Sequence, residues 1–261
     1  MQFTILNPYS SVGILHQKGL AALSISLFVD LGIDVDKLVK CINDYILAIP
    51  AFADYEIGEL ELYAVIPEAM NSYALGADIG SSYSGDQRLL IAEMMQVSDG
   101  IPLSTIPDYL TNIQSSVARA KLTKAQQKPL FAALSIGIKN YEYWISQIDE
   151  PTSPWIDYLD TLEGLKADIP SYVQAAIFGS LTAYGKLGRA NVLDSEMIAA
   201  LAGSLGVGVG KVLFKWVPEQ RQNQFSQHIP ALAFAGQMPM PPMMPDGFQM
   251  PQMPDSGCGC H

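Results

Sequence analysis

The sequence from Thr123 to Asp149 reads TKAQQKPLFAALSIGIKNYEYWISQID, and this stretch decides the fold class. Its large apolar side chains recur every three or four residues, which is the period of an α-helix. They are Leu130, Leu134, Ile138, Tyr141 and Ile145. Thr123 can cap the start, and Pro129 falls within the first two turns. We therefore predict a helix over residues 124–147.

The same period recurs along most of the chain, whereas alternating β-branched runs bounded by Asn-Gly or Asp-Gly turns do not occur in it. Such runs are the signature of strands and hairpins. Capping residues and prolines then divide the chain into segments. We predict further helices from residue 10 or 11 to 32, over 34–50, 57–73, 86–97 and 106–120, from Trp155 onward, and over 170–185 and 194–216. The sequence predicts an all-α, bundle-like domain of about eight or nine helices.

The chain divides by composition near residue 217. Residues 1–217 carry the helical pattern, and the whole chain is 49% apolar and 16% charged, which is typical of a globular protein. Residues 237–255 contain six methionines and six prolines. Proline removes backbone donors, and such a segment buries little apolar surface. We predict one globular domain over 1–217 and a disordered tail over 218–261 that ends in Cys-Gly-Cys-His.

The tail offers soft metal ligands. Thioethers and thiolates select Cu(I), Zn(II) and similar ions, and a Cys-x-Cys pair can chelate without a folded scaffold. Two alternatives are an inert linker and a thiol modification or anchoring site, including a peptide carried behind a large leader domain. Two thiols and one histidine fall short of a closed zinc site unless a second chain contributes. The candidate ligands are Met238, Met240, Met243, Met244, Met250, Met253, Cys258, Cys260 and His261.

Two charge-free segments form the second candidate. Residues 169–185 carry no charge for 17 positions, and residues 198–210 carry none for 13. A short connection between them predicts an antiparallel helical hairpin. Glycines such as Gly203 and Gly206 permit close backbone approach, in lipid or in a protein core. The hairpin 169–216 is either two buried core helices or the inserting element of a membrane-active, bacteriocin-like protein.

Charge excludes one class of partner. The chain has 26 acidic and 15 basic residues, a formal net charge of −11, so the sequence predicts no nucleic-acid partner. The basic residues between Arg119 and Lys139 are interpreted as a solvated helix face. A protein partner or a second copy of the chain stays open, as does membrane contact. The N-terminus has no basic region or long apolar run, which favours a cytoplasmic location over export.

Catalytic motifs are scarce. Residues 203–211 end in Gly-Lys, but Leu205 stands where a phosphate loop has its first glycine and Val212 stands where it has Ser or Thr. Three histidines occur in the whole chain. His16, flanked by Gly13 and Gly19, is interpreted as a histidine satisfied at a close helix contact, for example by a backbone carbonyl, and the alternative is a catalytic role. A set of aromatic residues could line a ligand pocket but more often forms core. These are Tyr141, Tyr143, Trp144, Trp155 and Tyr158.

The stretch from Asn7 to Leu20, NPYSSVGILHQKGL, resembles the opening motif N-P-Y-x-x-V-G-x-x-H-x-x-G-L of an uncharacterised family of bacterial proteins. The stretch from Leu122 to Trp144 and the glycine-rich later half are similar to further parts of that family. The resemblance implies a helical bacterial protein, exported or membrane-associated, with no established activity and no catalytic residues to carry over. The absence of a leader and the Met/Pro tail depart from the family pattern.

Together these observations favour a non-enzymatic helical interaction or binding protein whose tail binds Cu(I) or Zn(II). The alternative is the membrane-active protein that inserts the hairpin 169–216.

Overall fold

The structure is a computed structural model that describes residues 7–28, 34–52, 59–148, 150, 152–155, 162–187 and 195–214. These residues form eight α-helices and four short 3-10 turns, and no strand occurs among them. The predicted all-α class is confirmed. The helices are α1 (Ser10–Leu27), α2 (Val35–Leu47), α3 (Glu59–Ala74), α4 (Gly85–Met95), α5 (Ile106–Arg119), α6 (Lys124–Ile148), α7 (Leu162–Leu187) and α8 (Ser195–Phe214).

Local capping explains where several helices begin. The Asp34 carboxylate accepts a hydrogen bond from the backbone N–H of Lys37 at 2.8 Å, as an N-cap residue does. At the start of α6, the Thr123 hydroxyl accepts from the backbone N–H of Gln126, whose side chain accepts in return from the Thr123 N–H. This reciprocal pair satisfies two donors that the helix leaves without intrahelical partners.

Two predicted boundaries are wrong. The first helix was expected to run to residue 32, whereas α1 ends at Leu27. The sequence was expected to form a helix from Trp155 and a separate one from Pro170, whereas α7 starts at Leu162 and runs through Pro170 to Leu187. Trp155 itself lies in a turn, and residues 156–161 are outside the described residues. A proline inside a helix costs about 3 kcal/mol. The deep burial of α7 beyond this point, continuous from Ala175 to Tyr184, offsets that cost.

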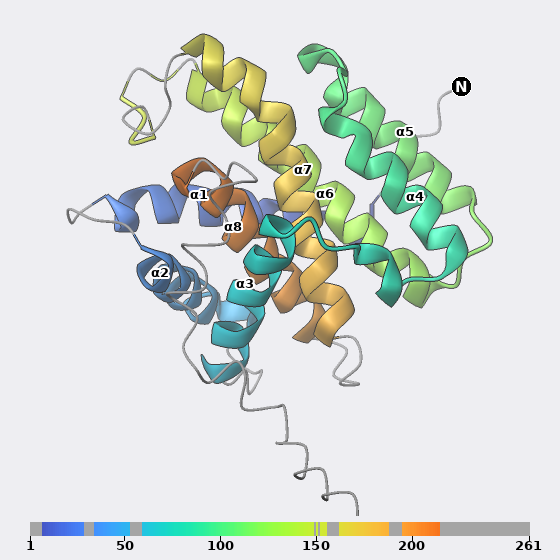
Figure 1. The fold of residues 1–261 in the computed structure, drawn as a ribbon, viewed down its shortest axis with the longest axis horizontal. Helices are drawn as coiled ribbons and strands as arrows, with labels where there is room; N and C mark the ends of the chain where they lie inside the picture. Colours follow the sequence, from blue (N-terminus) through green and yellow to red (C-terminus); the bar gives the residue numbers. More distant parts are fainter. Residues whose placement is uncertain are drawn as a thin grey trace, which may run out of the picture. The chain divides into compact units, whose positions relative to one another are not determined.

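The helices are arranged around α7 and α8 (Figure 1). α7 packs against α3, α6 and α8, while α8 also packs against α1, α2, α3 and α6. The paired contacts Gly179 with Gly203 and Ala176 with Gly208 show that α7 and α8 are antiparallel, as the sequence predicted. α4 and α5 contact one another and lie beside α6. The predicted domain boundary at 217 and the tail lie outside the described residues.

Candidate functional site: the central helical hairpin

Glycines bring the backbones of α7 and α8 into direct contact. A methyl group added at Gly203 would overlap the carbonyl oxygen of Gly179, and one added at Gly179 would overlap the carbonyl of Gly203. At Gly206 the added carbon would lie 2.6 Å from a methyl group of Ile66 on α3. The glycines predicted to allow close approach in α8 therefore do so against both α7 and α3.

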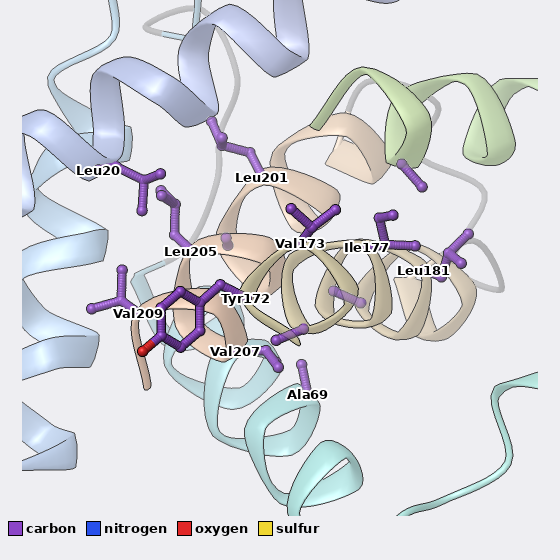
Figure 2. Packing of buried hydrophobic residues seen from close by; sticks show 14 of the residues in the cluster. Leu20, Ala69, Tyr172, Val173, Ile177, Leu181, Leu201, Leu205, Val207 and Val209 are labelled. Carbon is purple, nitrogen blue, oxygen red and sulfur yellow. The ribbon is translucent and has the colours of Figure 1, made fainter. Parts of the chain in front are cut away.

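The two helices are buried around their whole circumference. Every residue from Ile198 to Gly210 is buried, and so is every residue from Ala175 to Tyr184. In Figure 2, side chains of α7 and α8 such as Val173, Leu201 and Leu205 fill the layers between these helices and their neighbours. A helix that is apolar on all sides occurs in the centre of a large core or in a membrane.

The length of α8 matches a bilayer. Among the described residues, α8 is the one helix long and apolar enough to cross a membrane, with a mean hydropathy of 1.8 over 18 residues between Glu196 and Phe214. In the structure, 78% of that window is buried by protein. Its 20 residues span about 30 Å, the thickness of a hydrocarbon core. A central core helix passes the same test of length and composition.

One buried polar cluster connects the hairpin to α1 and α6. His16 is fully buried, and its two ring nitrogens lie 2.9 Å from the Ser204 Oγ on α8 and 2.9 Å from the Asn140 Nδ2 on α6. The Ser204 hydroxyl donates to the carbonyl of Leu201, so it accepts from His16 Nδ1–H, and Nε2 accepts from Asn140. Burial lowers the pKa of His16 to about 3, so the ring is neutral.

This geometry tests the interpretation of His16 as a satisfied histidine. The histidine is satisfied at a helix contact, as expected, but its partners are two side chains and not a backbone carbonyl. The neighbouring glycines have the predicted role: Gly13 abuts Ser135 of α6, and Gly19 abuts Leu205 and Tyr45. Serine, histidine and asparagine here form a packing contact without solvent access.

Further polar contacts hold the hairpin near its ends. The Tyr83 hydroxyl donates to the carbonyl of Leu181 at 2.7 Å, and the Gln174 amide donates to the carbonyl of Met95 at 2.6 Å. Lys128 of α6 pairs with Glu196 in the first turn of α8 at 3.3 Å.

The basic residues around Lys128 were predicted to form a solvated face. Arg119, Lys121 and Lys124 are exposed. Lys139 is half-buried, and Lys128 is the most buried of them, with a side chain 15% exposed.

The aromatic residues form core. Trp144 and Trp155 are fully buried with ring centroids 5.2 Å apart, and the Trp155 indole N–H donates to the Tyr143 hydroxyl at 2.7 Å. Phe28, directly after α1, packs edge-on against Trp155. These rings fill space between α1, α6 and α7, as helix-crossing aromatics do. Tyr158 lies outside the described residues.

The nine predicted metal ligands, Met238 to His261, all lie outside the described residues, so the soft-metal site stays a prediction from sequence. Within the described residues no three His, Cys, Asp or Glu side chains gather as a metal site would require. Comparisons with known protein families, with curated proteins and with solved structures found no match for this chain. The resemblance of residues 7–20 to a bacterial family likewise stays a prediction from those residues.

Proposed function

We propose that this protein is membrane-active and that α7 and α8 are its inserting element. The observation that carries the proposal is the position of a helical pair at the centre of the helical domain, with glycines at its contact and an uncharged, fully buried middle over residues 175–184 and 198–210. A helix that covers one face of a bundle needs one apolar stripe, whereas α8 carries apolar residues all round.

Lipid can replace the protein neighbours of the hairpin as an apolar surrounding. Hydrocarbon tails are as apolar as leucine, so apolar side chains that leave α1, α3 and α6 for a bilayer stay out of water. The contact of Gly179 with Gly203 is between small residues, the kind that holds helices together in membranes. The hairpin would therefore move as a pair, with α1 to α6 opening around it.

The proposal is tested by fixing the hairpin to its neighbour with a disulfide. A β-carbon at position 206 would lie 3.7 Å from the Cβ of Ile66 on α3, which is within the range of Cβ–Cβ distances in disulfides. The variant carries Ile66→Cys and Gly206→Cys in a background of Cys41→Ala, Cys258→Ser and Cys260→Ser. We expect the reduced protein to float with liposomes and release an enclosed dye, and the oxidised protein to do neither.

A matched disulfide within the hairpin serves as the control. A β-carbon at Gly208 would lie 3.5 Å from that of Ala176, so Ala176→Cys with Gly208→Cys joins α7 to α8 and leaves both free of α3. This oxidised variant should insert as the reduced one does. The proposal is overturned if the unmodified chain floats at no pH between about 4 and 8 with neutral or anionic vesicles, or if the α3–α8 disulfide changes nothing.

A second, separate proposal concerns the tail, and its composition favours it. Six methionines, two cysteines and a histidine within 24 residues supply the ligands that Cu(I) and Zn(II) prefer. On this view the chain is a non-enzymatic helical binding protein that presents a soft-metal tail, with a protein partner or a second copy of the chain completing the site. Metal content, described below, tests it independently of the hairpin.

A further inference from the structure

A cavity of about 290 Å³ lies at the end of the hairpin where α7 stops and α8 begins. It is bounded by the last turns of α7, the first turns of α6 and α8, and residues around the start of α4. Its volume is at the lower end of the range for small-molecule sites. An occupant would therefore have the size of a simple metabolite.

A buried ion pair forms one wall of this cavity. The Glu196 side chain is 12% exposed, and its Oε2 accepts from Lys128 Nζ at 3.3 Å and from the Tyr184 hydroxyl at 2.7 Å. Both bonds fall on the same oxygen. Among the described residues nothing hydrogen-bonds to Oε1, and Glu196 is part of the lining of the cavity.

Two further polar side chains of the wall already form hydrogen bonds. The Gln87 amide donates to the carbonyl of Gln126 and accepts from the backbone of Ser84, and the Tyr83 hydroxyl donates to Leu181. Burial, with the hydrogen bond to Glu196, raises the pKa of Tyr184, and burial raises that of Tyr83, so both rings stay neutral. They offer aromatic surface, and Pro129 adds to it.

The charges select the ligand. A ligand with only a negative charge would be repelled by Glu196, and one with only a positive charge would be repelled by Lys128. A ligand that carries both charges can place each of them beside the residue of opposite charge. The first turn of α6, which precedes Lys128, also lines the cavity, and the positive end of a helix favours a carboxylate. We propose that this cavity binds a small zwitterion of the α-amino acid class, its ammonium on Glu196 Oε1, its carboxylate toward Lys128 and its side chain on the tyrosines.

The first test uses the unmodified full chain and a set of ligands that differ by one group. Calorimetry with each of the common amino acids should find binding, strongest for an apolar side chain. The amide of the best ligand, which lacks the carboxylate, and its deaminated acid should each bind at least about tenfold more weakly, since a charge-assisted hydrogen bond is lost. Absence of binding at millimolar concentration, or equal binding of all three compounds, overturns the proposal.

Variants locate the site. Glu196→Gln and Lys128→Met should each weaken binding by about tenfold or more, while Lys124→Met, an exposed lysine one turn earlier on α6, should leave binding unchanged. Circular dichroism checks that each variant is folded. If Glu196→Gln unfolds the chain, Tyr184→Phe keeps the carboxylate and removes one of its donors, and it should change affinity less than Lys128→Met. Equal loss in Lys124→Met would place binding elsewhere and overturn the assignment.

Discussion

α2 and α8 are both regular helices of the same domain, yet they bury their side chains in different ways. α2 buries one stripe, which includes Leu38, Val39, Ile42 and Ile46, and its other side is exposed. α8 buries every residue from Ile198 to Gly210. The difference shows that α2 closes the outside of the bundle, whereas α8 needs an apolar surrounding on all sides, from protein here or from lipid in the proposed function.

Charge follows the same division. On α2, Lys40 and Asp44 form an exposed pair at 2.8 Å, one turn apart on the helix. The described part of the hairpin places its charges near its ends, as with Glu196 and Lys211, and its middle is tied to α1 through the neutral His16. The contrast between an outer helix and the hairpin can therefore be tested by charging or crowding the middle of the hairpin.

The largest expected effect is acid destabilisation through His16. Its pKa is about 3 in the folded protein and about 6.5 when exposed, so the unfolded chain binds the proton more readily between these values. The penalty is absent above pH 6.5 and grows as pH falls, to about 4–5 kcal/mol near pH 3. Urea unfolding should be measured for the unmodified chain and for His16→Gln. The difference between their unfolding free energies should change by this amount between neutral pH and about pH 3.

Subtracting the two unfolding free energies at each pH removes the contribution of carboxylates common to both proteins. A difference that stays constant from pH 7.5 to 3.5 would mean that the ring is protonated as easily in the folded protein as in the unfolded chain. It would then contradict the burial of His16 between α1, α6 and α8.

The next effect comes from crowding the hairpin. Gly203→Ala places a methyl group against the Gly179 carbonyl and the Ala183 side chain, and a backbone contact cannot be relieved by a rotamer change. We expect a loss of about 3 kcal/mol in unfolding free energy, at the upper end for overpacking. Gly85→Ala in the first turn of α4 meets nothing within 4 Å, so it should be neutral or stabilise by up to about 1 kcal/mol. Equal changes in unfolding free energy at the two positions would contradict the close approach of α7 and α8.

The sequence predicted the features that depend on residues close together in the chain. The spacing of apolar residues and the capping residues predicted the all-α class, the start of α2 at Asp34 and the extent of α6, whose end differs by one residue from the prediction. The glycines at 13 and 19 marked a close contact because glycine is unfavourable in a helix without such a reason. These signals act within a few turns of chain.

What the sequence did not reveal depends on distant partners. Ser204 is 188 residues from His16, and Glu196 is 68 residues from Lys128, so spacing along the chain carries no information about either pair. Lys128 looked like its basic neighbours because its burial depends on where α8 begins. The passage of α7 through Pro170 was missed for the same reason, since tertiary packing outweighed the local penalty of proline.

The smallest effect on the folded domain should come from the tail. Elemental analysis of anaerobically purified protein should find stoichiometric copper or zinc in the full chain and none in a chain stopped at Ala235, because the ligands from Met238 to His261 are then absent. The unfolding free energy of the helical domain should differ by less than about 0.5 kcal/mol between the two chains, as for changes outside a core.

This measurement also separates the two proposed functions. If the tail handles metal and the hairpin inserts, the chain stopped at Ala235 loses metal and still floats with liposomes. If the chain stopped at Ala235 loses both its metal and its flotation, insertion of the hairpin depends on the tail. The contrast between α2 and α8 would then not suffice to explain insertion. Metal in neither chain after a Cu(I) or Zn(II) challenge would end the soft-metal proposal, and metal in both would move the site into residues 1–235, where the described part of the chain gathers no such ligand set.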